Sequence, residues 1–386
     1  MFPNKWTKLT EQIANADYSS EEKPFFTVVD SGTVLPAKPF DQKSWGLGGV
    51  VDSDGKIVTA SLSKSFGGYY EADLKHCIEI PETVYYIPLI PRHWGHFLVD
   101  VISKLWFVLD QDKGYRIAFC GEGWDENRIT GNYLQLLSGL GIEEERLLYV
   151  QQVTRFDKIL IPSATFGASD DKTYNGFYYR KLVQRIIQEV MASPEISEMT
   201  PIRKVYFTRT GFYRAKVNEI GEKDIEKLFE KNGYTVLAPE KLPISEQIFY
   251  FQTADEIASL SGTIPHNAMF AGSNTRLIIL NRTCIPNYTQ IKINQMFNLS
   301  AVFIDCYSRW TERHPRTYGG KDGGPIWVEV NNNLLNFFRN RKMSADEPAK
   351  MAYLKNIMGF LKISGRITLR KNRVVMSVYG KMKNRG

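Results

Sequence analysis

The sequence lacks several features that would each define a class of protein. Its four cysteines, in 386 residues, are far apart and form no CxxC pair, so neither a disulfide framework nor a thiolate zinc site is indicated. No apolar run approaches the roughly 20 residues that a membrane-spanning helix needs. The opening stretch MFPNKWTKLTEQ has no apolar core of a signal peptide. We therefore expect a cytoplasmic protein with reduced thiols.

The positive net charge of +7 is concentrated at one end of the chain. Residues 349–386 contain ten Lys or Arg residues and no Asp or Glu. Without this segment, 39 basic residues stand against 42 acidic ones, which is a net charge of −3. A nucleic-acid-binding fold needs a basic face on its body. We therefore expect no nucleic-acid partner.

Strand and helix patterns alternate in two blocks. In the first, buried-strand patterns at 84–90, 115–122, 146–150 and 158–162 alternate with helical patterns at 95–109, 132–142 and 176–192. In the second, strand patterns at 204–210, 235–240, 256–262, 275–282 and 301–307 alternate with helical ones at 222–234, 244–254 and from 266. Such alternation predicts parallel sheets covered by helices.

We expect an α/β protein with two Rossmann-like domains facing a cleft, because the blocks meet at a proline-bounded loop near 193–201. A β-rich segment at the N-terminus and a basic C-terminal tail complete it. The predicted boundaries are 1–195 and 196–325 for the domains, 326–348 for a terminal helix that packs back on the body, and 349–386 for the tail.

Three short patterns resemble known ligand motifs but have simpler explanations. Asp52-Ser-Asp54 matches a metal-binding DxD, yet Gly55 follows it, as a hairpin turn requires. The glycines at 46–49 lack the third glycine of a dinucleotide loop. His93 and His96 could pair on a metal, but only Asp100 is near enough in sequence to join them. We expect no metal and no cofactor.

The stretch RHWGHFLVD, 92–100, is the first candidate for chemistry. His96 and Asp100 are four residues apart, so on a helix they share one face, where the carboxylate can orient the imidazole and raise its basicity. Arg92 and His93 stand just before this helix, beyond the strand 84–90, where open α/β sheets bind ligands. A helix start held by side-chain hydrogen bonds explains the pattern equally well.

Two further stretches could bind phosphate groups. In YFTRTGFYRAKVNE, 206–219, Arg209 ends a buried strand and Lys216 follows in a loop, a placement that suits a diphosphate. A solvated turn with basic residues is the alternative. In LSGTIPHNAMFAG, 260–272, a small-residue loop precedes a helix and could offer backbone N–H groups to a phosphate. Its candidate residues are Gly262, Thr263, His266 and Asn267.

Taken in order, these motifs resemble glycosyltransferase family 61, in particular its bacterial branch of capsule and surface-polysaccharide enzymes. The resemblance rests on HFLVD, TRTGFYRAKVNE, the SEQ at 245–247, and SGTIPHNAMF followed by LIILNR, and covers residues 25–340. It implies a GT-B architecture, an inverting mechanism without a DxD metal, and a nucleotide-sugar donor held by the C-terminal domain. It also places an oligosaccharide or polysaccharide acceptor, which can be lipid-linked, on the N-terminal domain.

An inverting mechanism suggests roles for the candidate residues, which we state as hypotheses. His96 and Asp100 provide the base, although the sequence leaves open which of them takes the proton. Arg209, Lys216 and the 262–267 loop neutralise the departing nucleoside diphosphate across a shared gap. Supporting contacts to donor or between domains are assigned to Asn218, Glu219, Glu246 and Gln247. A polyol-phosphate transferase and a non-catalytic glycan-binding or scaffold protein with the same fold stay open as alternatives.

The tail is a separate prediction. Met351, Leu354, Ile357, Met358 and Leu361 recur every three or four residues and alternate with lysines. This pattern is typical of a basic amphipathic helix that lies on an anionic membrane surface. We therefore expect a peripheral position at the inner face of the cell membrane, with a disordered basic tail or a helix packed on the body as alternatives.

Overall fold

The computed structural model describes residues 22–38, 46–62, 68–122, 128–166, 176–285, 287–312 and 324–371. The chain forms two compact units. Unit 1 comprises Met1–Met199 and Ile291–Phe297, and unit 2 comprises Thr200–Gln290 and Asn298–Gly386. The chain therefore enters unit 2 at residue 200, returns to unit 1 for seven residues, and then finishes in unit 2.

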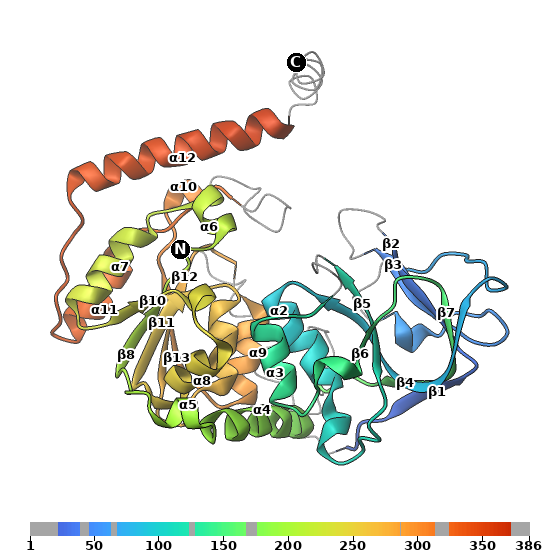
Figure 1. Ribbon diagram of the computed structural model, residues 1–386. Coiled ribbons are helices and arrows are strands. Elements are labelled where there is room, and N and C mark those ends of the chain that lie inside the picture. The colour runs from blue at the N-terminus through green and yellow to red at the C-terminus, as the bar shows by residue number, and fades with distance from the viewer. Residues whose placement is uncertain are drawn as a thin grey trace. The chain divides into compact units, whose positions relative to one another are not determined.

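Unit 1 contains a mixed sheet (Figure 1). Its strands are β1 (Phe26–Asp30), β2 (Thr33–Lys38), β3 (Leu47–Val51), β4 (Ile78–Pro91), β5 (Ile117–Glu122), β6 (Leu147–Tyr149) and β7 (Thr154–Pro162). The order is β3-β2-β7-β4-β5-β6, with β1 also paired to β7. Strands β7, β4, β5 and β6 are parallel, whereas β1, β2 and β3 join antiparallel. The chain goes from β4 to β5 on one side and later places β7 on the other, so a topological switch point lies between β4 and β7.

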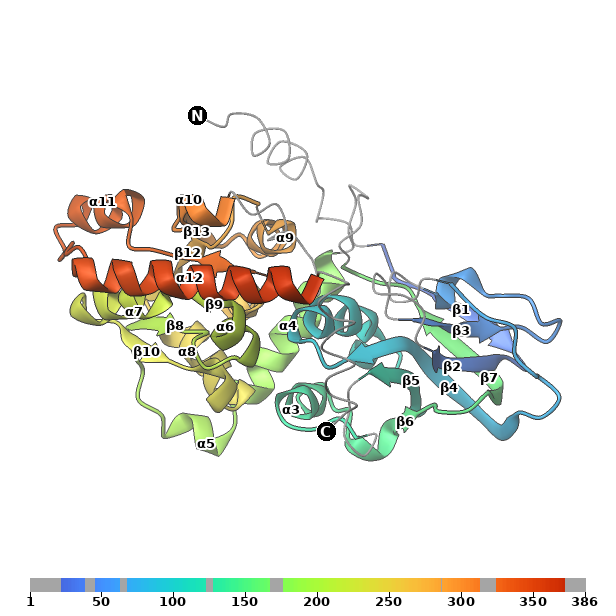
Figure 2. The same ribbon diagram turned by 90° about the horizontal axis from the view of Figure 1, so that it is seen from above.

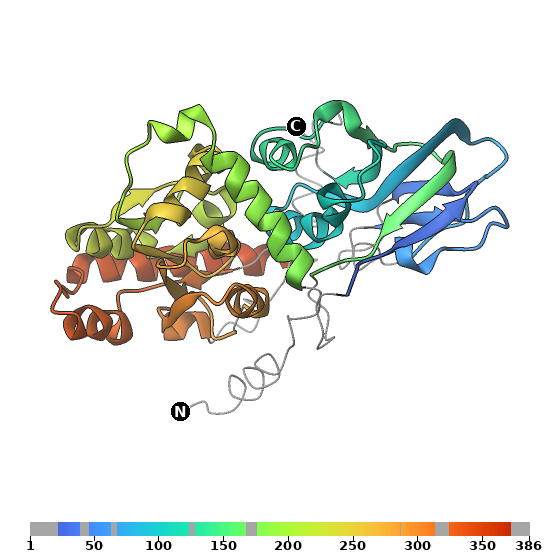
Figure 3. The same cartoon turned by 90° about the horizontal axis from the view of Figure 1, so that it is seen from below.

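The helices of unit 1 are mostly short. They are α2 (Trp94–His96), the π-helix η2 (Phe97–Val101), the 3-10 helices η1 (Thr59–Ser61), η3 (Ile102–Lys104), η4 (Trp106–Leu109) and η6 (Glu144–Arg146), and the α-helices α3 (Asn132–Ser138), α4 (Gly176–Met191) and α5 (Pro194–Ser197). The long helix α4, green in Figure 3, packs on η3 and η4. Its buried residue Tyr179 donates a hydrogen bond to the carbonyl oxygen of Leu98, at 2.9 Å, and so fixes the π-helix.

Unit 2 contains an all-parallel sheet of five strands. These are β8 (Lys204–Phe207), β10 (Thr235–Leu237), β11 (Glu256–Leu260), β12 (Arg276–Asn281) and β13 (Ser300–Asp305), in the order β10-β8-β11-β12-β13. This is a doubly wound order whose switch point lies between β8 and β11. A separate pair of strands consists of β9 (Glu219–Ile220) and β14 (Ile326–Trp327).

Helices cover both faces of the unit 2 sheet. The helices of unit 2 are α6 (Tyr213–Asn218), α7 (Glu222–Lys231), η7 (Pro239–Lys241), α8 (Ile244–Thr253), η8 (Ile264–Phe270), α10 (Arg309–Glu312), α11 (Asn332–Asn340) and α12 (Lys350–Lys371). A further helix, α9 (Tyr288–Met296), begins in unit 2 and continues into the segment Ile291–Phe297 of unit 1. On one face, Tyr206 of β8 packs on Phe229 of α7, which in turn contacts Phe338 of α11. On the other face, Phe207 stacks on Phe251 of α8. Two successive residues of one buried strand thus point to opposite faces of the sheet and into two separate cores, as expected when helices cover both faces.

The expected alternation of strands and helices is confirmed, and the protein is of the α/β class. Three local predictions were wrong. The helix at 95–109 is a series of short α, π and 3-10 turns, and the helix after Gly262 is 3-10. The terminal helix predicted within 326–348 begins only at Asn332, because Trp327 pairs in β14 and Asn331 caps the helix with its side chain. The GT-B arrangement stays a prediction.

The turn at Asp52 is confirmed. Its carboxylate Oδ1 accepts hydrogen bonds from the backbone N–H of Asp54, at 3.0 Å, and of Lys56, at 2.8 Å, while Gly55 has a φ of +79°. The first aspartate of the DxD pattern therefore serves the turn. Within the described ranges, no helix is both long enough and apolar enough to cross a membrane.

Candidate active site

The first group of candidate residues follows the carboxyl end of β4, next to the switch point of unit 1. Nδ1 of His96 lies 2.7 Å from Oδ2 of Asp100. The two side chains are 45% and 31% exposed, so both can meet a substrate. An ionised carboxylate only accepts hydrogen bonds. In this contact Nδ1 of His96 is therefore the donor and carries the ring proton, and Asp100 accepts. A proton taken from a substrate would then go to Nε2 of His96.

Local backbone geometry keeps this pair in place. Asp100 lies in the π-helix, a rare element that is often found at functional sites. The buried side chain of Lys104 donates to the carbonyl oxygen of Asp100, at 3.1 Å. Burial lowers the pKa of Lys104, and the nearby charge of Asp100 works in the opposite direction. The side chain of Lys104 therefore ties the backbone of Asp100 to the turn that follows it.

His93 lies beside the pair, and Arg92 directly follows β4. The rings of His93 and His96 meet edge to face, with centroids 4.8 Å apart. Trp94 and Phe97 pack on Tyr133 of α3, which anchors this turn to the body of unit 1. Burial raises the pKa of Tyr133 to about 12, although the charge of Arg92 lowers it.

The second group lies at the carboxyl edge of the unit 2 sheet. Arg209 follows β8 and Arg282 follows β12, and both donate to the same atom, Oε1 of Glu219, at 2.9 Å and 2.5 Å. The exposed fraction is 12% for the side chain of Arg209, 24% for Arg282 and 8% for Glu219. Nε of Arg209 is buried and has no hydrogen-bond partner within the described residues. Two guanidinium groups against one carboxylate give the cluster a positive charge.

Glu222 lies beside this cluster without cancelling its charge. Its Oε1 accepts from the backbone N–H of Arg209, at 3.0 Å, and from the hydroxyl of Tyr206, at 3.1 Å. Burial raises the pKa of Glu222 to about 8, although the hydrogen bond and the charge of Arg209 lower it. Burial, and to a smaller extent the positive charge of Arg209, lowers the pKa of Arg282 to about 10. Arg282 therefore stays charged at neutral pH. At that pH the cluster has two cations and one anion.

The loop after β11 approaches this cluster closely. Gly262 has a φ of +149°, and a Cβ atom there would lie 2.6 Å from Nη1 of Arg209. Asn287 donates to the carbonyl oxygen of Gly262, at 3.2 Å, and the backbone N–H of Arg282 donates to Ser261. Thr263 is half-buried and precedes η8. Arg209 and the glycine loop, both assigned to the diphosphate from the sequence, therefore lie next to each other at the switch point.

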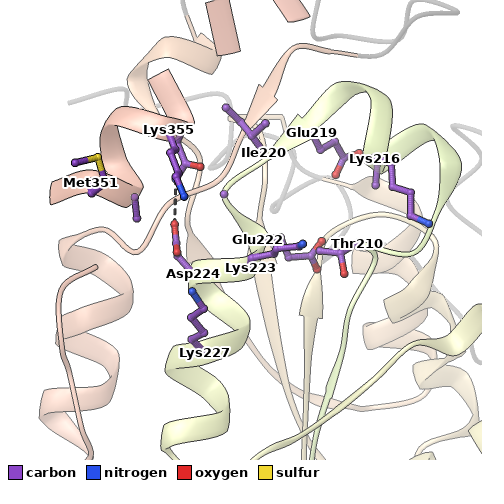
Figure 4. A pocket seen from close by; sticks show the side chains of 14 residues that line it. Thr210, Lys216, Glu219, Ile220, Glu222, Lys223, Asp224, Lys227, Met351 and Lys355 are labelled. Atoms are coloured by element: carbon purple, nitrogen blue, oxygen red, sulfur yellow. Dashed lines mark hydrogen bonds between the residues drawn. The ribbon is translucent and has the colours of Figure 1, made fainter. Parts of the chain in front are cut away.

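A pocket of about 730 Å³ adjoins this cluster (Figure 4). Glu219 and Glu222 contribute to its wall, together with residues of α6, α7 and α12. Four lysines line it: Lys216, Lys223, Lys227 and Lys355. No ion pair is found for any of these four within the described parts of the chain. Asp224, also in the wall, accepts a hydrogen bond from Asn356 of α12, at 3.0 Å. The pocket therefore favours an anionic ligand.

Other predicted residues lie inside the fold. His266 and Asn267 are buried, and their side chains contact Gln290, at 2.8 Å, and Gln247, at 3.0 Å. Gln247 in turn donates to the carbonyl oxygens of Pro239 and Leu242. These hydrogen bonds satisfy the buried polar groups and hold the 262–267 loop on its buried side.

Two supporting residues have different surroundings. Asn218 accepts from Arg366 of α12, at 3.0 Å, which gives it a role in fixing that helix. Glu246 lies half-buried in the first turn of α8.

Sequence reasoning missed Arg282, Glu222 and Lys104. Arg282 could have been found, since it follows a buried strand just as Arg209 does. The other two gave no signal, because acidic residues commonly begin helices and a lysine in a helical pattern is normally exposed. Within the described residues, no cluster of three or more His, Cys, Asp or Glu side chains could hold a metal ion.

Comparison with protein families agrees with the resemblance seen in the sequence. The model of the family Glycosyltransferase 61 matches residues 94–278, just under half of the chain. The match begins at α2, includes His96, Asp100, Arg209 and Gly262, and ends within β12. It supports glycosyltransferase family 61 and, with it, a glycosyltransferase that acts on a sugar donor and a glycan acceptor. No curated protein matches the chain significantly.

Proposed function

We propose that the protein is an inverting glycosyltransferase of capsule or other surface-polysaccharide synthesis. It transfers a hexosyl or pentosyl group from a nucleotide-sugar donor to an oligosaccharide or polysaccharide acceptor, which can be lipid-linked, in the cytoplasm. A GT-B arrangement without a bound metal belongs to the same proposal. The observation that supports it best is the cationic cluster of Arg209 and Arg282 at the carboxyl edge of the unit 2 sheet. Arg209 lies within the region that the family model matches, and Arg282 lies four residues beyond its end.

The donor's diphosphate fits this cluster chemically. A diphosphate is recognised best by fixed guanidinium groups, which can each donate two hydrogen bonds. Glu219 holds both guanidinium groups at the carboxyl edge of the sheet. Lys216 and the other lysines of the pocket add positive charge for the same ligand.

The chemical step uses the His96–Asp100 pair as the base and the cationic cluster for the leaving group. His96 accepts the proton of the acceptor hydroxyl at Nε2, while Asp100 orients the ring and stabilises the imidazolium that forms. The hydroxyl oxygen attacks the anomeric carbon from the side opposite the diphosphate. The bond from carbon to diphosphate oxygen breaks, and the anomeric configuration inverts. Arg209, Arg282 and Lys216 stabilise the charge on the leaving diphosphate.

A panel of nucleotides tests the donor site. We expect nucleoside diphosphates and nucleotide sugars to raise the melting temperature, because a ligand at about 100 times its Kd adds about 2.7 kcal/mol of stability. Arg209→Lys should weaken nucleotide binding about tenfold or more, since lysine cannot reproduce the bidentate geometry. Arg203→Lys, at an exposed arginine paired with Asp255, is the matched control and should bind as the wild type does.

Product analysis tests the reaction. Incubation with a nucleotide sugar that binds should release the nucleoside diphosphate, and nuclear magnetic resonance of the product should show the inverted anomer. Release of a nucleoside monophosphate would favour a polyol-phosphate transferase instead. Absence of stabilisation by every nucleotide would favour a non-catalytic glycan-binding protein and contradict the proposal.

A further inference from the structure

The helix α12 has two unlike faces. It lies along β9 and β14 of unit 2, as Figure 2 shows, and it packs there through Phe360, Ile363 and Ile367, which are all buried. Phe360 contacts the rings of Trp310 and Trp327, with centroids 5.8 Å and 6.1 Å away. Arg366 donates to Asn218 in α6. These contacts fix which side of α12 faces away from unit 2.

The outward side has a row of large apolar side chains. Met351, Leu354, Met358 and Leu361 are 64%, 51%, 64% and 55% exposed. They are three or four residues apart and therefore lie on one strip of the helix. Leu369, also exposed, comes back to the same strip, because 18 residues make about five turns. We call these five residues the outer row. Five such side chains in one strip are unusual on a surface that meets only water.

Charge identifies the partner that suits the outer row. Lys362 is exposed and lies next to it on the helix, and Lys350 precedes it. Lys355, also exposed, lines the pocket beside α7. The chain from Ala349 to Gly386 has ten basic residues and no acidic one. An apolar strip flanked only by basic residues matches an anionic bilayer, where apolar side chains enter the acyl boundary and lysines contact phosphate groups. A second copy of this helix would instead bring like charges together.

We propose that α12 lies flat on an anionic lipid surface, with the outer row inserted and Phe360, Ile363 and Ile367 still packed on unit 2. The helix then joins unit 2 to the membrane as a rigid element. This inference goes beyond the transfer reaction and does not depend on it, since it concerns the side of α12 that faces away from β9 and β14.

Co-sedimentation with vesicles tests the proposal on the full-length protein. The wild type should bind vesicles of phosphatidylglycerol and phosphatidylcholine, and it should bind pure phosphatidylcholine vesicles far less. Higher salt should weaken the binding. The triple variant Leu354→Gln, Met358→Gln, Leu361→Gln should lose at least about tenfold in partition, because it removes the apolar strip and keeps strong helix formers. The double variant Lys350→Gln, Lys362→Gln should lose about thirtyfold, through charge alone.

Controls separate lipid binding from folding and from the reaction. Phe25→Gln changes an exposed aromatic residue of unit 1 and should bind vesicles as the wild type does. All variants should keep the wild-type melting temperature and its increase with nucleotide, so a failure of the donor site would appear separately. Wild-type-like vesicle binding by the triple variant, or no binding by the wild type, would overturn the proposal. A wild-type dimer that the triple variant dissociates would also overturn it, and would assign the outer row to a second copy.

Discussion

Nη1 of Arg209 occupies the space that a side chain at Gly262 would need, since a Cβ atom there would lie only 2.6 Å from it. The absence of a side chain at residue 262 therefore sets the position of the guanidinium group. This relationship joins the loop after β11 to the end of β8 at the switch point.

Gly262→Ala should displace the guanidinium of Arg209. We expect nucleotide-dependent stabilisation to fall strongly, and stability to fall by about 1–3 kcal/mol because the φ of +149° is unfavourable for alanine. Gly233→Ala is the control, since Gly233 has a φ of +80° and no atom within 4 Å of its Cβ position. It should lose stability and keep nucleotide binding. Equal nucleotide binding by both variants would separate Gly262 from the donor site.

His96→Ala should lower the transfer rate by about 10²–10⁴, because general base catalysis contributes that much. Asp100→Asn should lower it less, since the ring keeps Nε2 but loses its orientation. Nucleotide binding should not change, because the pair belongs to unit 1. His76→Ala is the control: Nδ1 of His76 lies 2.6 Å from Asp73, and both side chains are well exposed. Rates are measured as release of nucleoside diphosphate, and full activity in the His96 variant would refute the assignment.

Glu222 should make stability depend on pH. In the folded protein its pKa is about 8, whereas the unfolded chain ionises near the ordinary value of 4.5. The free energy of unfolding should therefore be fully preserved below about pH 4.5, fall as pH rises towards 8, and level off above it. Its steepest slope should be about 1.4 kcal/mol per pH unit.

Glu222→Gln should remove this slope, because glutamine can still accept from Arg209 and Tyr206. Urea unfolding on both sides of neutral pH measures the effect. Glu230→Gln, at an exposed residue of the same helix, should keep the wild-type slope. Identical slopes in wild type and Glu222→Gln would show that Glu222 does not titrate as the burial requires.

Phe360→Ala should weaken the docking of α12. Phe360 is buried among aromatic rings, and removing such a side chain costs about 3 kcal/mol or more. The neighbouring Leu361→Ala should cost less than about 0.5 kcal/mol, since Leu361 faces outward. Chemical unfolding measures both changes, and limited proteolysis should cut α12 faster in the Phe360 variant. Similar costs for the two substitutions would contradict the observed orientation of the helix.

The sequence predicted the course of the sheets well, because buried parallel strands appear as short apolar runs between helical patterns. It also placed Arg209 at the end of a strand, and His96 with Asp100 after another, because strand ends can be located from the same runs. The apolar spacing of residues 350–363 correctly indicated a helix. Which side of this helix faces away from unit 2 could not be predicted, since Phe360 and Leu361 are equally apolar in the sequence.

Other features depend on contacts that local patterns do not contain. His266 and Asn267 follow a small-residue loop, and the sequence does not tell whether such polar groups turn toward a ligand or toward Gln290 and Gln247. The pKa of Glu222 results from burial beneath the turn of Arg209. The π-helix at Asp100 depends on Tyr179, about 80 residues later in the chain.

The seven residues that the chain contributes to unit 1 late in the sequence have a consequence for dissecting the protein. Phe297 packs edge-on against Tyr179, and the carbonyl oxygen of Met296 accepts from Arg180. A fragment ending at Met199 would therefore lose these contacts with α4, and a fragment starting at Thr200 would carry most of α9 without the residues on which it packs. The halves are not interchangeable modules, so recombination with homologous chains should exchange 291–297 together with the first 199 residues.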